Sequence, residues 1–198
     1  RRPLPATATG AVHEHGGAAG RRRACNLHAT QCSRPELAAH QPGRYHGRMK
    51  LQVPFLQLPV SFDAEALAHE IAQVDESHWR PHPNKLPGNS ALTLVATNGE
   101  PDNDDLAGEM RPTPVLEQLP RVKEVLSALG ATWGRSRLMR LSGQAEVTAH
   151  VDTNYYWRER MRVHVPITTT PDVRFQAGEA EINMAAGECW IFDTWRRH

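Results

Sequence analysis

The stretch RMRVHVPITTTPDVRFQAGEAEINMAAGECWIF, residues 160–192, decides the fold class. Its extended segments are short, and the turn signals Thr-Pro-Asp and Ala-Gly-Glu separate them. Residues 134–141 and 144–152 have the same character, with a Ser-Gly turn between them. Closely spaced strands with little helix between them predict an antiparallel barrel or sandwich in the C-terminal part of the chain.

The preceding residues predict helices and two further strands. An edge strand is expected at 51–61, because its prolines cannot donate to a central ladder. A second strand is expected at 90–97. The expected helices are one at 63–76 capped by Asp63, a short one capped by Thr113, and one at 120–129 closed by Gly130. Helices followed by a β core make an α+β fold.

The charge divides the 198-residue chain into two unlike parts. Residues 1–50 hold nine Lys/Arg against two Asp/Glu, giving +7, whereas residues 51–198 hold fourteen against twenty, giving −6. The first 48 residues lack apolar periodicity, so we predict that 1–48 is a disordered basic tail. Met49 is expected to be the natural start, with tail residues that are not native coding sequence. The folded domain is expected at 49–198.

The tail gives weak signals for partners. Arg21–Arg23 invite a nucleic-acid interpretation, but no aromatic residues are interleaved to stack bases, so specific nucleic-acid binding is not expected. The stretch CNLHATQC at 25–32 lacks the spacing of a zinc site. No apolar run has the length of a membrane span, and Cys189 is the only cysteine after the tail, so a cytoplasmic protein is expected.

The motif His150-Val151-Asp152 is the first candidate for chemistry. In a strand, residues i and i+2 point to the same face, so these two side chains would lie together. His198, at the end of the segment CWIFDTWRRH, adds a second histidine. Two histidines and one carboxylate form the set that binds iron(II) on one face and leaves positions open. Zinc accepts the same ligands, so residue types alone do not separate the two metals.

A second candidate follows at RMRVHVPI. Arg160, Arg162 and His164 alternate with apolar residues, so one face of the strand is cationic. A plain solvated face is one interpretation. The other is a carboxylate clamp, because a guanidinium matches a carboxylate with two hydrogen bonds.

The ordered succession HxD, RxH, GExxxF and a distal histidine resembles the aspartyl/asparaginyl β-hydroxylase family of iron(II)- and 2-oxoglutarate-dependent oxygenases, from about Met49 to the last residue. The resemblance implies a double-stranded β-helix, jelly-roll or cupin-like, with N-terminal helices. It implies that His150, Asp152 and His198 bind Fe(II), and that Arg162 and His164 contact the cosubstrate 2-oxoglutarate. O₂ is the second cosubstrate.

In the family, a strand after the distal histidine supplies an arginine for the far carboxylate of 2-oxoglutarate, whereas this sequence stops at His198. The resemblance therefore predicts a C-terminally truncated domain that lacks its last strand and is weakly active or inactive. The implied substrate is an aspartyl or asparaginyl side chain or a free amino acid such as proline. The alternative is a cupin-like protein that binds a metal or a small acid without oxygenase activity.

Residues near the ligands have expected supporting roles. Thr148, Asp193 and Thr194 are candidates to orient the histidines, by proximity in sequence. Tyr155, Tyr156 and Trp157 would line the substrate mouth, or pack as ordinary core aromatics.

Overall fold

The computed structural model describes residues 23–32, 51–81, 86–143, 145–154, 156–157 and 160–198. Its strands form an eight-stranded antiparallel sheet of order β2-β10-β7-β1-β6-β4-β3, with β5 paired to β4, and a separate hairpin of β8 and β9. The strands are β1 Arg23–Cys32, β2 Phe55–Ser61, β3 Arg80–Pro81, β4 Asn89–Thr97, β5 Met110–Pro112, β6 Thr132–Ser142, β7 Arg160–Thr168, β8 Phe175–Ala177, β9 Ala180–Ile182 and β10 Glu188–Phe192. The helices are α1 Ala64–Ile71 and α2 Pro120–Ala128, with single 3-10 turns η1 Glu76–His78 and η2 Leu116–Gln118.

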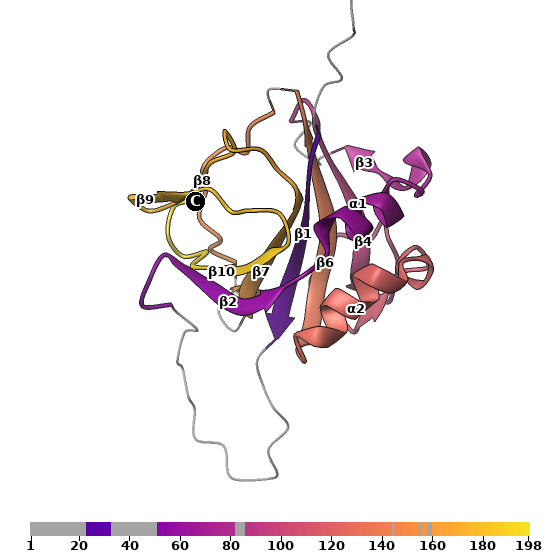
Figure 1. Cartoon of the computed structure of the whole chain (residues 1–198). Coiled ribbons are helices and arrows are strands. Elements are labelled where there is room, and N and C mark those ends of the chain that lie inside the picture. Colours follow the sequence, from indigo (N-terminus) through magenta and orange to yellow (C-terminus); the bar gives the residue numbers. More distant parts are fainter. Residues whose placement is uncertain (1–22, 33–50, 82–85, 144, 155, 158–159) are drawn as a thin grey trace, which may run out of the picture.

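The predicted α+β class is confirmed. Figure 1 shows both α-helices on one side of the large sheet, and the hairpin with the C-terminus on the other side. The core lies between helices and sheet, where Leu67 of α1 and Val122 of α2 pack with strand residues such as Leu92 and Val165. The opposite face of the sheet is therefore available for polar chemistry.

Helices α1 and α2 begin where the sequence predicts, although α1 ends at Ile71 and not at the predicted Glu76. The Asp63 carboxylate accepts a hydrogen bond from the Ala66 amide at 2.9 Å, which caps α1. Helix α2 has no cap of its own, and the Glu70 carboxylate of α1 accepts from the amides of Arg121 and Val122 at 2.9 and 3.1 Å. Gly130, with φ +57°, follows the end of α2 as expected.

The prediction that Thr113 caps a helix is wrong. The 3-10 turn η2 begins after Val115 and has no side-chain cap. The Thr113 hydroxyl, fully buried, lies 2.8 Å from the Thr93 carbonyl and 3.2 Å from that of Leu94. It ties the segment after β5 to β4, because a buried hydroxyl without a partner would be costly.

Within the range predicted to be a disordered tail, the structure forms β1, so that part of the prediction is wrong. Strand β1 lies inside the sheet, where Leu27 is paired with Leu138 of β6 on one side and Val165 of β7 on the other. Its alternate residues Cys25, Leu27 and Ala29 are buried in the core. The apolar residues at alternate positions of β1 are few, and Gly, Ala and Arg surround them in the sequence, so the pattern is weak. Residues 1–22 and 33–48 lie outside the described residues.

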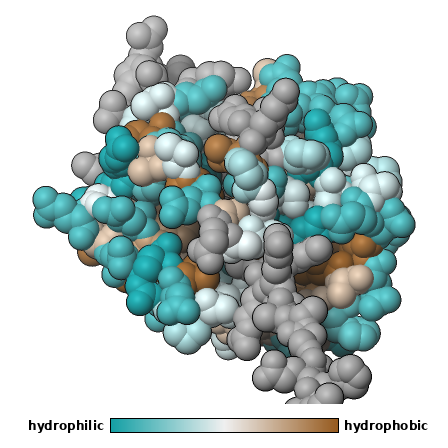
Figure 2. Space-filling model, turned by 90° about the horizontal axis from the view of Figure 1, so that it is seen from above, coloured by the Kyte–Doolittle hydropathy of each residue, from teal (hydrophilic) through white to brown (hydrophobic). Residues whose placement is uncertain are grey.

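The surface in Figure 2 is mostly hydrophilic, with apolar residues in small separate areas. The large apolar side chains that are exposed among the described residues are Val53, Leu56, Val147 and Val151. Within the same residues, no helix is long and apolar enough to cross a membrane.

Candidate metal centre

The segment that contains His150 and Asp152 follows β6 and has no regular strand. A strand was predicted at 144–152; residue 144 lies outside the described residues, and the others form none. Their backbone instead pairs with the segment after β10. The amides of His150 and His198 each donate to the other's carbonyl, at 2.8 and 2.9 Å, and the Asp152 amide donates to the Thr194 carbonyl at 3.0 Å. These bonds hold the two segments side by side.

The three predicted ligands converge as a result. Nε2 of His150 lies 3.8 Å from Oδ1 of Asp152, and Nε2 of His198 lies 4.0 Å from Oδ2. One ligand atom from each residue falls within 4.8 Å of the others, a separation that a single metal ion can span. Among the described residues, this is the one group of three or more His, Cys, Asp or Glu side chains with such spacing.

Both imidazoles are fixed in the form that binds a metal through Nε2. Nδ1 of His150 lies 2.9 Å from the Thr148 carbonyl, and Nδ1 of His198 lies 3.0 Å from the Arg196 carbonyl. A carbonyl only accepts, so each Nδ1 carries a hydrogen, and in the neutral ring each Nε2 then has the lone pair that a metal needs. The Nε2 of His198 is buried and has no hydrogen-bond partner among the described residues. A buried nitrogen with an unused lone pair fits a metal ligand.

The turn after β10 aims His198 at the site. The buried Asp193 carboxylate accepts from the Trp195 amide and from Nε of Arg196, both at 3.1 Å. The carbonyl of Arg196 then holds the His198 ring. Of the supporting residues expected from sequence, Thr148 and Thr194 act through backbone carbonyls, and Asp193 through this turn.

Arg162 contacts the candidate ligand set directly. Its Nη2 lies 2.8 Å from Oδ2 of Asp152, and its guanidinium lies 4.3 Å from the ring centroid of Trp157. Burial lowers the pKa of Arg162, and the charge of Asp152 opposes that shift. The guanidinium is therefore confined between a carboxylate and an indole ring, beside the candidate metal position.

The aromatic residues after Asp152 pack inside the protein. Tyr156 is fully buried; its hydroxyl accepts from the Arg135 amide at 2.7 Å, and Arg160 lies 3.9 Å above its ring. Trp157 packs edge-on against Tyr156 at 5.1 Å. Tyr156 therefore packs as a core aromatic, which is one of the two expected alternatives, and Tyr155 lies outside the described residues.

His164 lies deep in the same interior. It is buried, and its ring centroid lies 5.1 Å from that of Phe175 and 6.5 Å from that of Phe192. The Phe192 ring centroid lies 5.1 Å from that of His198. Burial, together with the nearby charge of Arg162, lowers the pKa of His164 to about 3. His164 is therefore neutral at physiological pH and offers a neutral imidazole.

This depressed pKa predicts an acid-sensitive fold. Unfolded His164 has an ordinary pKa of 6.5 and takes up a proton below that pH, whereas folded His164 resists protonation down to about 3. The free energy of unfolding is therefore complete above pH 6.5 and falls below it, with His164 alone costing about 2 kcal/mol between pH 7 and pH 5. Urea unfolding of the wild type and His164→Asn at both pH values measures this. Equal pH dependence of the two proteins would contradict the shift.

Sequence reasoning missed Arg135 and Arg137 of β6. The alternation in RSRLMR, residues 135–140, places these two arginines on one face, as RMRVH does for Arg162 and His164. The period of two that both strands share was the sequence signal that could have identified Arg135 and Arg137.

Comparison with known proteins agrees with this geometry. No curated protein and no solved structure matched the chain. The family model described as aspartyl/asparaginyl β-hydroxylase matches residues 64–198, a range that includes the three converging side chains and both helices. The chain therefore belongs to the aspartyl/asparaginyl β-hydroxylase family.

Proposed function

We propose that the chain is an iron(II)- and 2-oxoglutarate-dependent dioxygenase that hydroxylates an aspartyl or asparaginyl side chain or a free amino acid such as proline. The observation that carries the proposal is the convergence of two Nε2 atoms and one carboxylate within 4.8 Å, each imidazole held by its Nδ1. A three-ligand set of this composition leaves coordination positions for small molecules. Family membership supports a hydroxylase.

In this proposal His150, Asp152 and His198 hold iron(II). When bound, the metal supplies activation of O₂ coupled to decarboxylation of 2-oxoglutarate to succinate, and a hydroxyl group enters the substrate. The protein supplies orientation. The Thr148 and Arg196 carbonyls accept from the Nδ1 atoms and so direct both Nε2 atoms to the metal position, and the paired backbones hold the two histidines side by side.

Arg162 and His164 bind 2-oxoglutarate in this proposal. Arg162 already lies 2.8 Å from a carboxylate, that of Asp152, so its guanidinium is placed for anions beside the metal position. His164 is neutral and adds hydrogen bonding without a second charge. The Phe175 and Phe192 rings pack against His164 and the Trp157 ring against Arg162, so these apolar rings would limit the access of water.

The fold proposed for this function is the double-stranded β-helix. The mostly antiparallel sheet, the additional hairpin and the ligands on the face away from the helices support it.

Anaerobic reconstitution tests the proposed function. The purified chain with Fe(II), 2-oxoglutarate and then O₂ should release a low but detectable amount of succinate, measured by mass spectrometry, and iron should be required. Zn(II) in place of Fe(II) should bind and give no succinate. Tight metal binding with no succinate under any condition would instead favour a metal-binding protein without oxygenase activity.

A further inference from the structure

Arginines on two strands share the face of the sheet that holds the metal ligands. Arg135 and Arg137 are two residues apart on β6, so their side chains lie on one face, opposite the core residue Leu138. Position 28 of β1 is paired with Arg137 on one side and His164 on the other. Residues paired across neighbouring strands share a face, so Arg135 and Arg137 lie on the same face as His164 and Arg162.

These guanidiniums are close together and poorly hydrated. The side chains of Arg137 and Arg162 are only 16% and 17% exposed. Burial, reinforced by the nearby charge of Arg135, lowers the pKa of Arg137 to about 10. Like charges that share a region of low hydration repel one another, so such a group favours an anion between them.

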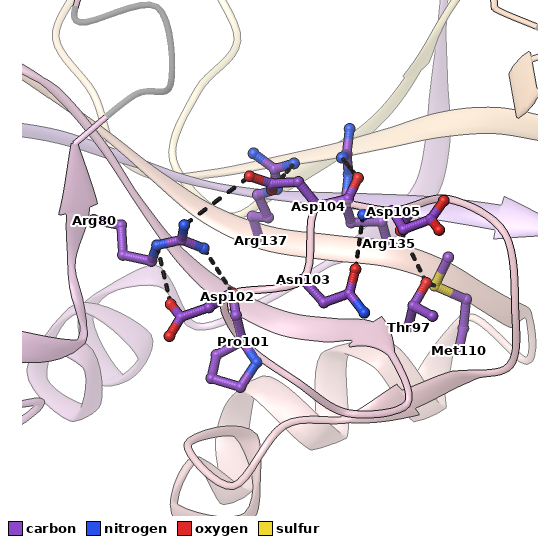
Figure 3. A network of polar contacts seen from close by, with 10 residues as sticks. All are labelled: Arg80, Thr97, Pro101, Asp102, Asn103, Asp104, Asp105, Met110, Arg135 and Arg137. Carbon is purple, nitrogen blue, oxygen red and sulfur yellow. Dashed lines mark hydrogen bonds and ion pairs between the residues drawn. The ribbon is translucent and has the colours of Figure 1, made fainter.

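The counter-ion now present is an aspartate of the loop between β4 and β5, shown in Figure 3. Oδ1 of Asp104 lies 3.6 Å from Nη2 of Arg137, and Nη1 of Arg135 donates to the Asp104 carbonyl at 3.4 Å. Good charge-assisted bonds measure about 2.7–2.9 Å, so both contacts are loose. The Asp104 side chain is 49% exposed.

The neighbouring Arg80 makes shorter contacts with the same loop. Nε of Arg80 lies 3.1 Å from Oδ1 of Asp102, and its Nη1 donates to the Pro101 carbonyl at 2.9 Å. Its distance to Oδ2 of Asp104 is 4.0 Å. Arg80 therefore anchors the loop mainly through residues 101 and 102, and the loop can stay attached when Asp104 leaves the arginines of β6.

We propose that Arg135 and Arg137 form a carboxylate-binding subsite beside the metal centre, and that an incoming carboxylate displaces Asp104 from them. Two chemical sources present this group: the second carboxylate of a 2-oxo dicarboxylic acid, or the carboxylate of an acidic substrate. The inference rests on the proposed function only for the identity of the anion. Arg162 serves the metal side of the same face, so the two β6 arginines act on the far end of the bound molecule.

Calorimetric titration of the full chain in the presence of a metal chelator tests the subsite without relying on turnover. The probes are 2-oxoglutarate, 2-oxobutanoate, which lacks the second carboxylate, and L-aspartate. Arg137→Gln should weaken the binding of one dicarboxylate by about ten-fold or more, because a charge-assisted hydrogen bond to a buried arginine is lost. Selective loss of 2-oxoglutarate binding, with 2-oxobutanoate unchanged, assigns the site to the cosubstrate. Selective loss of aspartate binding assigns it to the substrate.

Asp104→Asn gives an independent result of opposite sign. Removing the internal competitor should tighten binding of the same dicarboxylate, whereas Arg111→Gln, at an exposed ion pair on β5, should leave the affinity for all three probes unchanged. Thermal unfolding checks that each variant is folded, and Arg135→Gln replaces Arg137→Gln if the latter unfolds. Wild-type affinities in Arg135→Gln/Arg137→Gln, or weaker binding in Asp104→Asn, would overturn the subsite. Absent succinate release would count against the proposed function but leave these affinities unaffected.

Discussion

Replacing either His150 or Asp152 by alanine is expected to abolish iron binding and 2-oxoglutarate turnover, with different effects on stability. His150 is 44% exposed on its side chain, so its loss should change the free energy of unfolding by less than about 1 kcal/mol. Asp152 is 10% exposed and lies 2.8 Å from Arg162. Its removal leaves a buried guanidinium without this carboxylate, which costs about 3 kcal/mol.

The measurements are metal content after dialysis against Fe(II), succinate release, and urea unfolding without metal. Asp152→Asn separates the two effects, because it keeps an oxygen near Arg162 but weakens the metal ligand. His78→Ala is the matched control, since this exposed histidine lies on η1 outside the site. Full coupled activity in an Asp152 variant would show that the ligand assignment is wrong.

Deleting residues 1–48 is expected to remove cooperative unfolding. Strand β1 is hydrogen-bonded on both sides, to β6 and β7, so without it the sheet separates into β2-β10-β7 and β6-β4-β3. Two long edges would then present unpaired backbone, and the core would lose Leu27, whose truncation to alanine alone typically costs about 2–5 kcal/mol. Aggregation is the expected consequence.

Deleting only residues 1–22 provides the control, because it leaves β1 intact. Circular dichroism melting and size-exclusion chromatography compare the two deletions with the full chain. A peptide of residues 23–32 added to the longer deletion should restore part of the melting transition, because the open position between β6 and β7 fits one antiparallel strand. A chain of residues 49–198 that unfolds like the full chain would show that β1 does not contribute to stability.

Features with local causes could be predicted from the sequence. The Asp63 cap, the Gly130 stop and the strand β7 follow from neighbouring residues, and each is present in the structure. The edge position of β2 follows from its prolines. For the site, the three side chains predicted as ligands do meet. The strand on which the i, i+2 argument relied is absent, and backbone pairing with the segment after β10 brings them together instead.

Features with tertiary causes could not be predicted. Strand β1 has too few apolar residues to be predicted from its own sequence. It is buried because it pairs with β6 on one side and with β7 on the other. Thr113 stands where a helix cap is expected from the sequence, but its hydroxyl donates to carbonyls of β4 instead. Similarly, Arg135 and Arg137 alternate as on a solvated face, and only the loop with Asp104 shows that they are enclosed.

The paired backbones of His150 and His198 would couple local unfolding of the C-terminal segment to the loss of a metal held in the proposed site. If residues 193–198 detach from the protein, the site loses one imidazole outright, and His150 loses both of its backbone bonds to His198 in the same step. A metal bound in the proposed site would therefore stabilise the form in which these segments are paired by RT ln(1 + [M]/Kd), about 2.7 kcal/mol at a concentration one hundred times Kd. Amide hydrogen exchange at positions 150 and 198 should accordingly slow together, by the same factor, as metal is added.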